Sequence, residues 1–192
     1  MNFKEVVLTN RSYRRFAQDR RISLATLEGL VDLARQTACT ANKQPLQYAL
    51  VASEEMTATI FPLLGWAGYL THWKGPEEGE RPAAYIVILG NDAIATEPQI
   101  DLGIAAQTIM LGATAQGLGG CMLASVNREK VHEALRLPEG SRVLLVLALG
   151  TPVEKVYLEP LGEEGNIKYW RDAEGGHHVP KRGLEDVIIA RS

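Results

Sequence analysis

The chain has 192 residues, of which 46% are apolar, with a formal net charge of −3 and a pI near 5.8. This length and composition suit a single domain, residues 1–192, with one substantial core. The acidic balance argues against nucleic acid or an anionic membrane as the main partner. The two cysteines lack metal-type spacing, and no apolar segment is long enough to span a bilayer or direct export. We therefore expect a cytoplasmic protein without a bound metal.

The first half of the chain predicts a helix followed by strands. Ser23 is a suitable N-cap for apolar residues at helical spacing that continue to Ala34. Short apolar runs flanked by turn residues predict buried strands. These runs are Leu46 to Ala52, Ala83 to Gly90 and Val143 to Gly150. The segment from Gly65 to Pro82 has no period and carries aromatic residues, which indicates a surface excursion.

The second half predicts one unusually apolar helix, from Asp101 to Gly117, whose apolar and small residues occupy every face. Such a helix must be buried all round. A chain of this size supplies little cover, so we expect a subunit interface to provide the remainder. Asn127 predicts the N-cap of a helix from Arg128 to Leu137 that stops at Pro138. Beyond Pro152 apolar pairs are few, and we expect the C-terminal residues to wrap around the domain rather than build core.

A basic stretch near the N-terminus indicates an anion site. Arg11, Ser12 and Arg14 combine guanidinium groups with a hydroxyl in four residues, and Arg15 follows. Guanidinium groups match the geometry of a phosphate and a serine hydroxyl adds a short donor. The alternative is a solvated basic turn that pairs with carboxylates.

A second polar group lies about thirty residues later, where Asn42, Gln44 and Pro45 lead into the first predicted strand. The two amides offer both donors and acceptors, as the edge of a planar heterocycle requires. Taken alone, the same residues are more typical of ordinary loop chemistry. Two weaker signals follow: Gly117-Leu118-Gly119-Gly120, suited to positive φ and close backbone approach or to a helix C-cap, and the basic pair Lys181 and Arg182.

Together these segments resemble the nitroreductase family of FMN-dependent oxidoreductases, over nearly the whole chain. The resemblance implies an α+β fold, an α/β/α sandwich whose mainly antiparallel central sheet is flanked by helices. It also implies a homodimer with two FMN sites across its interface and a C-terminal segment extended across the dimer. Two positions depart from the family pattern, Leu46 where tryptophan is frequent and Met122 where an aromatic residue or proline is frequent.

The resemblance also assigns site residues. It places Arg11, Ser12 and Arg14 on the phosphate and ribitol, and Asn42 and Gln44 on the flavin. A backbone N–H at Ala124 or Ser125 would donate to flavin N5. Lys181, with Arg182, would return to the phosphate, although a solvated charged tail is the alternative for this pair.

Trp66, Tyr69 and Trp73 are candidates for the wall of the substrate pocket or for subunit packing. The adjacent His177 and His178 receive no role, and Cys39 and Cys121 are interpreted as small packing residues. No residue is expected to act as a nucleophile, because the cofactor performs the chemistry.

The implied reaction is hydride transfer from NADH or NADPH through FMN to a small-molecule oxidant such as a nitroaromatic or a quinone, in a ping-pong sequence. The alternatives are another reaction on the same fold, such as dehydrogenation, dehalogenation or flavin handling, and an FMN-binding module without turnover.

Overall fold

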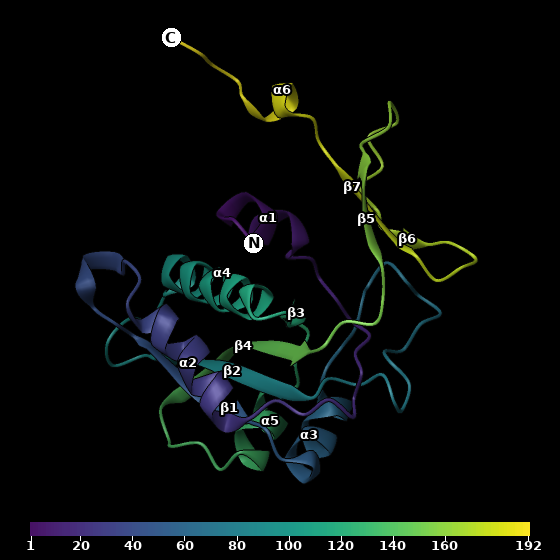
Figure 1. The fold of residues 1–192 in the computed structure, drawn as a ribbon. Helices are drawn as coiled ribbons and strands as arrows, with labels where there is room; N and C mark the ends of the chain where they lie inside the picture. Colours follow the sequence, from purple (N-terminus) through teal and green to yellow (C-terminus); the bar gives the residue numbers. More distant parts are fainter. The chain divides into compact units, whose positions relative to one another are not determined.

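The computed structural model describes residues 1–192, and contacts within the chain divide it into two compact units. The first unit contains Met1–Trp66 and Gly75–Val153. The second contains Ala67–Lys74 and Glu154–Ser192. Each unit has its own sheet (Figure 1). A division by contacts does not show that either unit folds on its own. The expectation of a single domain therefore stays a prediction.

The first unit is built on a four-stranded antiparallel sheet with the order β1-β2-β4-β3. Its strands are β1 (Leu46–Val51), β2 (Ala84–Asn91), β3 (Gly119–Leu123) and β4 (Ser141–Gly150). The three predicted strands are confirmed within two residues at each end. Strand β2 is almost completely buried, as expected for an apolar strand between two neighbours.

Strand β3 was not predicted, because it begins with the glycines of the Gly117 to Gly120 motif. Glycine is disfavoured in strand interiors, but here it permits close contact between segments of the same chain. A Cβ at Gly120 would lie 2.1 Å from the carbonyl oxygen of Ala148 on β4, and one at Gly119 would lie 2.6 Å from the Tyr13 ring. Two glycines of the motif thus lie tightly against other parts of the chain, and close approach of this backbone to a ligand stays a prediction. Positive φ is confirmed only at Gly117, where φ is 76°.

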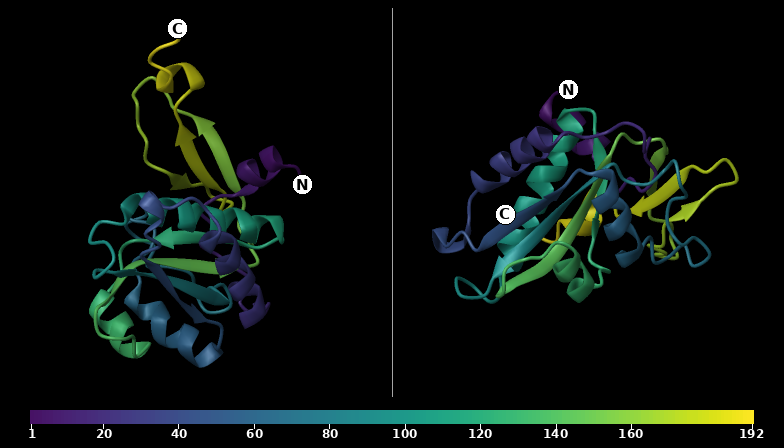
Figure 2. Two further views of the ribbon diagram at one scale, coloured as in Figure 1. Left: turned by 90° about the vertical axis from the view of Figure 1, so that its left-hand side faces the viewer. Right: turned by 90° about the horizontal axis from the view of Figure 1, so that it is seen from below.

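Helices cover both faces of this sheet. The elements are α1 (Phe3–Thr9), α2 (Leu24–Arg35), α3 (Glu54–Ile60), α4 (Gln99–Ala115) and α5 (Arg128–Ala134), with short 3-10 turns at Thr40–Asn42 and Phe61–Leu63. Helices α2 and α4 pack against one face and α3 and α5 lie on the other (Figures 1 and 2). The largest buried cluster lies between α2, α4 and the sheet. Ser23 caps α2 by accepting a hydrogen bond from Thr26 N, as predicted.

Helix α4 is apolar on every side, as the sequence indicated, but within one chain it is buried along only part of its surface. Ile109 and Ala113 are inaccessible, whereas Ile100 is 71% exposed. Leu102, Ile104 and Leu111 are half-buried. Apolar surface thus remains available on this helix for a further partner.

Helix α5 is shorter than predicted and ends at Ala134 instead of Leu137. Arg136 adopts a left-handed conformation with φ of 48°, so the helical path is broken before Pro138 is reached. Its N-cap is the predicted one, since the Asn127 side chain accepts a hydrogen bond from Lys130 N.

The second unit contains a small sheet that the sequence did not indicate. Its strands are β5 (Val156–Pro160), β6 (Trp170–Arg171) and β7 (His177–Lys181), in the order β5-β7-β6, and a single helical turn, α6 (Leu184–Val187), follows. The main buried cluster contains no residue beyond Leu149, so the expectation that this region wraps rather than builds core is not contradicted and stays a prediction. These strands are short, mix aromatic with charged residues and lack a regular apolar alternation, so no periodic signal marks them.

The segment from Gly65 to Pro82 contains no regular helix or strand, as predicted, but Trp66, Ala67 and Pro76 within it are buried. No helix in the structure is both long and apolar enough to cross a membrane.

Candidate functional site

The basic motif is anchored at one edge of the first unit's sheet. Ser12 forms an isolated parallel bridge with Gly120 of β3, and Tyr13 N donates to the Gly120 carbonyl at 2.9 Å. The preceding residue, Asn10, donates from Nδ2 to Met110 O at 3.1 Å and to Thr114 Oγ1 at 2.9 Å on α4. The motif therefore runs along β3 and is fixed to the last turns of α4.

The three arginines of this motif have different surroundings. Arg15 forms a two-point ion pair with Glu80 and is committed to the fold. Arg14 donates from Nη1 to the Ser12 carbonyl at 3.2 Å. Arg11 is half-buried and donates to the carbonyls of Val7, at 2.7 Å, and Asn10, but no carboxylate lies within ion-pair distance of it. A partly buried charge without a counter-charge is costly, so an external anion fits this position.

The segment that follows β3 is held from two sides. Ala124 and Ser125 are exposed at the end of the strand. Arg128 Nη2 donates to the Ala124 carbonyl at 3.1 Å, and Gly65 N donates to the Ser125 carbonyl at 2.8 Å. A Cβ at Gly65 would meet Ser125 Oγ at 2.4 Å, so this position requires glycine for the close approach. Both contacts fix the backbone whose N–H groups were predicted to face a flavin.

The amide segment has an unusual backbone. Ala41, Asn42 and Gln44 have φ values of 49°, 53° and 50°, whereas only two other non-glycine residues of the chain have positive φ. Left-handed conformations cost free energy in such residues and persist only where the surroundings enforce them, which is typical of functional sites. Gln44 N donates to Cys39 Sγ at 3.1 Å, and Gln44 Nε2 lies 3.3 Å from Asn42 Oδ1. Cys39 thus has a hydrogen-bonding role besides packing.

Asp101, which the sequence did not reveal as a site residue, anchors this segment. It lies in the first turn of α4, is 6% exposed and accepts a hydrogen bond from Thr40 N at 2.7 Å. The Thr40 backbone N–H holds the pKa of Asp101 below its ordinary value of 3.8 despite burial. Asp101 also lines a cavity of about 190 Å³ with Cys39, Gln44 and Tyr48. The only sequence signal was an acidic residue at the start of an otherwise apolar helix.

The basic motif and the amide segment lie at diagonally opposite corners of the sheet. Ser12 pairs with β3, one edge strand, and Gln44 leads into β1, the other. They also lie at opposite ends, because Gly120 is level with Leu149 of β4 whereas Leu46 is level with Arg142. With three inter-strand spacings and about six residues of strand between them, the separation is about 25 Å. The packed core of one chain therefore stands between these two groups.

The remaining predicted site residues belong to several environments. Trp66, in the first unit, packs against Phe61 with ring centroids 5.7 Å apart and is 8% exposed. In the second unit Tyr69 contacts Tyr169, with centroids 4.9 Å apart, and Arg171 lies 4.1 Å above the Trp73 ring. A role for all three in a substrate pocket stays a prediction. Lys181 ends β7 and Arg182 follows it, both exposed, and their part in a phosphate site likewise stays a prediction.

His178, which had no predicted role, is the centre of the second unit's polar network. Its ring stacks between Trp170 and Tyr157, with centroids 5.1 and 5.0 Å away. Nδ1 lies 2.7 Å from Glu159 Oε1 on β5, and Nε2 lies 2.9 Å from Asp172 Oδ2. The two carboxylates raise the pKa of His178 above 6.5, and the pKa of Asp172 is lowered by His178 and by the Gly176 N–H.

This network predicts a stability optimum for the second unit in mildly acidic solution. The contribution of a protonated His178 is complete below about pH 6.5 and is lost as the pH rises through its higher folded pKa. The contribution of ionised Asp172 is present above pH 3.8 and is lost as the pH falls through its lower folded pKa. Amide hydrogen exchange in residues 170–181, corrected for intrinsic rates, should therefore become faster from pH 6 to pH 9. His178→Gln should abolish this dependence and His132→Gln should preserve it; equal dependence in both variants would contradict the assignment.

The model of the nitroreductase family matches residues 7–151. The chain belongs to the nitroreductase family. This family membership confirms the resemblance, and the mixed fold of helices around an antiparallel sheet agrees with it. The matched region contains the basic motif, the amide segment and the backbone after β3, and it ends before Lys181.

Individual relatives agree with this assignment. A protein of Archaeoglobus fulgidus, provisionally named NADH dehydrogenase/NAD(P)H nitroreductase, is 26% identical over 79% of this chain and 86% of its own. The crystal structure of a nitroreductase family protein from Clostridium novyi is 28% identical, with a TM-score of 0.65 over 79% of this chain and 86% of that one. A provisionally assigned nitroreductase from Exiguobacterium sibiricum, solved in complex with FMN, is 19% identical, with a TM-score of 0.66 over 80% and 89%. The last of these shows similarity of fold.

Proposed function

We propose that this protein is an FMN-dependent oxidoreductase that transfers a hydride from NADH or NADPH to a flat acceptor such as a nitroaromatic or a quinone. Membership of the nitroreductase family supports the reaction class. The name of the Archaeoglobus relative supports a nicotinamide donor, and the complex from Exiguobacterium supports FMN as cofactor. The acceptor class is the one that the family resemblance implies.

The observation that carries the proposal is the diagonal placement of the two polar corners. An FMN molecule has a phosphate at one end and a hydrogen-bonding heterocycle at the other, and the chain provides one corner suited to each. Because the core lies between these corners in one copy, a complete site needs the basic corner of one copy and the amide corner of a second. A homodimer with two-fold symmetry contains two such combinations. The exposed apolar surface of α4 supports such an interface.

The chain's residues fit FMN in charge and in hydrogen-bonding capacity. Arg11 offers a half-buried guanidinium without a carboxylate partner, and Ser12 and Arg14 complete the phosphate corner. Asn42 and Gln44, on a backbone that Asp101 and Cys39 constrain, offer amide donors and acceptors for the ring edge. The backbone of Ala124 and Ser125 would supply the donor near N5. Lys181 and Arg182 are proposed as additional phosphate ligands.

When bound, FMN supplies the redox chemistry by accepting a hydride at N5 and passing it to the acceptor. The protein's part is to position the ring and the nicotinamide. Arg128 and Gly65 hold the backbone beside the proposed N5 position, and Asp101 holds the amide segment. Hydride transfer requires reacting atoms about 3 to 3.5 Å apart and aligned, so these contacts would control the rate of reduction.

An experiment that mixes two variants tests whether one FMN site is built from residues of two subunits. We expect a variant with Arg11→Ala and Arg14→Ala, and another with Asn42→Ala and Gln44→Ala, each to reduce a quinone poorly. Unfolding and refolding an equal mixture allows the copies to exchange. Each mixed dimer then contains one intact site, so about a quarter of the parent activity should return. Each variant refolded alone is the control. No recovery in a mixture shown by mass spectrometry to contain mixed dimers would contradict a shared site.

The proposal also predicts that neither thiol is required for turnover. Cys39→Ser retains an acceptor for Gln44 N, and Cys121 is buried, so each serine variant should keep quinone reduction within a few-fold of the parent. NAD(P)H should bleach the bound flavin in both variants, and double-reciprocal plots should be parallel. Loss of turnover with full flavin occupancy in either variant would indicate a redox thiol instead. Intersecting plots would indicate a ternary complex.

A further inference from the structure

Two arginines line a small cavity beside β4, separate from the corners described above. The cavity has a volume of about 240 Å³ and lies between the start of α4, the start of α5 and the first residues of β4. Its lining includes the polar residues Arg128, Arg142 and Gln99 and the apolar residues Pro98, Leu102 and Val143. No carboxylate belongs to this lining. The cavity thus combines positive charge with an apolar wall.

Arg128 is held rigidly at this cavity. Its Nε donates to the Val143 carbonyl at 3.1 Å and its Nη2 donates to the Ala124 carbonyl at 3.1 Å. No carboxylate lies within ion-pair distance, and the remaining nitrogen, Nη1, has no partner in the chain. A guanidinium already fixed by two carbonyls loses little side-chain freedom when it binds an anion, which favours affinity.

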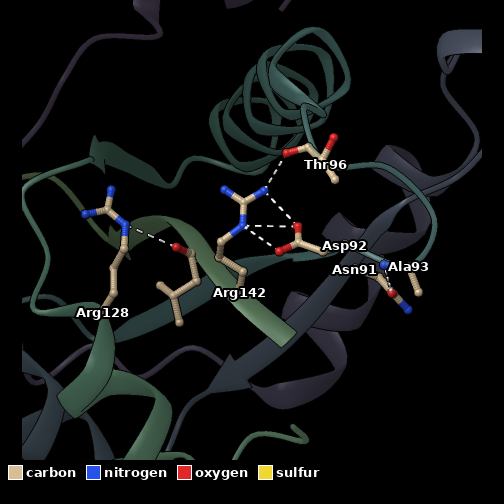
Figure 3. A network of polar contacts seen from close by, with 7 residues as sticks. Asn91, Asp92, Ala93, Thr96, Arg128 and Arg142 are labelled. Carbon is tan, nitrogen blue, oxygen red and sulfur yellow. Dashed lines mark hydrogen bonds and ion pairs between the residues drawn. The ribbon is translucent and has the colours of Figure 1, made fainter. Parts of the chain in front are cut away.

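Arg142 is oriented by a different network. It forms a bidentate pair with Asp92, with Nη2 at 2.9 Å from Oδ1, and donates to the Thr96 carbonyl at 2.7 Å. In Figure 3 its nitrogen without a dashed line points toward the side on which Arg128 lies. Asp92 offsets the charge of Arg142, so Arg128 supplies the net positive charge and Arg142 an additional donor. The site is therefore suited to a single negative charge.

The geometry points to a small organic carboxylate as the ligand of this cavity. We propose that its carboxylate binds Arg128, with Arg142 and Gln99 as further donors, and that a short aliphatic or aromatic body packs against Leu102 and Val143. A planar carboxylate matches a guanidinium group. The volume of about 240 Å³ is below the range of about 300 to 1,000 Å³ typical of drug-sized ligands, which favours a ligand smaller than a nucleotide.

A larger adjoining cavity does not compete for this ligand. It has a volume of about 490 Å³ and shares Arg128, Arg142 and Val143 with the smaller one. Glu129 and Glu133 also line it, as does Asp92, so its charges disfavour an anion. The ligand is thereby confined to the side of the arginines that faces α4.

Titration of the purified protein with benzoate, followed by ¹H–¹⁵N NMR, tests the proposal. We expect saturable shifts at the amides of Gln99, Leu102 and Val143. Benzamide, which has the same shape without the charge, should bind at least tenfold more weakly. Inorganic phosphate should also bind more weakly, because it lacks the apolar body. Equal affinity for benzamide, or for phosphate, would overturn the assignment to an organic carboxylate.

Two variants locate the site. Arg128→Gln should lower benzoate affinity at least tenfold, as expected for loss of a charged hydrogen bond. Gln99→Glu adds a negative charge at an exposed position in the first turn of α4, where an acidic residue does not disturb the helix. This charge should repel benzoate and lower its affinity to a similar extent. Lys130→Gln removes an exposed charge from the same helix as Arg128 and should leave binding unchanged. Unchanged binding in Gln99→Glu, or equal losses in all three variants, would refute this location.

Discussion

Arg11→Ala should weaken FMN binding by roughly ten- to a hundredfold, the consequence of losing a charged hydrogen bond worth about 1.5 to 3 kcal/mol. Arg11 is half-buried and has no carboxylate partner, so its charge remains available to a phosphate. The dissociation constant is measured by titrating the flavin-free protein with FMN and following flavin fluorescence. Riboflavin, which lacks the phosphate, should bind parent and variant equally.

The control for this prediction is Arg20→Ala, which removes an exposed arginine from the same region. Arg11 also donates to the Val7 carbonyl near the end of α1, so the variant's thermal unfolding must be compared with the parent's. An affinity for FMN equal to that of the parent would show that Arg11 only closes the end of α1. The basic motif would then lose its assignment to the phosphate.

The sequence predicted those elements in which burial alone determines the order of apolar and polar residues. Strands β2 and β4 are continuous apolar runs, and α2 has a clear cap and an apolar face. Strand β3 was missed because it begins with Gly119 and Gly120 instead of the bulky residues typical of strands. These two glycines allow close packing against Tyr13 and Ala148. In the second unit, β5 and β7 pair although they are separated by sixteen residues without a periodic pattern.

The candidate site could be predicted in its residue types but not in its arrangement. The arginines and amides carry recognisable chemistry, but their separation depends on the strand order β1-β2-β4-β3, which places the segments beside opposite edge strands. Sequence distance gave no indication of this, because about thirty residues and one helix are compatible with many separations. Asp101 was missed for a similar reason, since its importance depends on a backbone N–H more than sixty residues away.

Asp101→Ala should slow flavin reduction by NAD(P)H roughly ten- to a hundredfold, because hydride transfer is that sensitive to displacements of about 1 Å. The variant removes the acceptor for Thr40 N, and with it the anchor that holds Ala41, Asn42 and Gln44 in left-handed conformations. Relaxation of these residues toward ordinary φ values would move both amides away from the ring. The rate is measured by anaerobic stopped-flow absorbance at saturating FMN, so that weaker cofactor binding does not contribute.

The variant Asp101→Asn separates the hydrogen bond from the charge, because its side-chain oxygen still accepts the Thr40 N–H while the charge is lost. It should recover most of the parent rate. Asp101 has a lowered pKa, so its ionised form stabilises the folded state above the ordinary carboxyl pKa of 3.8, and this contribution is lost as the pH falls through the folded value. Unfolding of Asp101→Asn should therefore depend less on pH below 4 than unfolding of the parent.

The control variant is Asp32→Ala, which removes the negative charge of an exposed acidic residue on α2. A normal reduction rate in Asp101→Ala would mean that the backbone around Asn42 keeps its conformation without this anchor, and Asp101 would then have no positioning role.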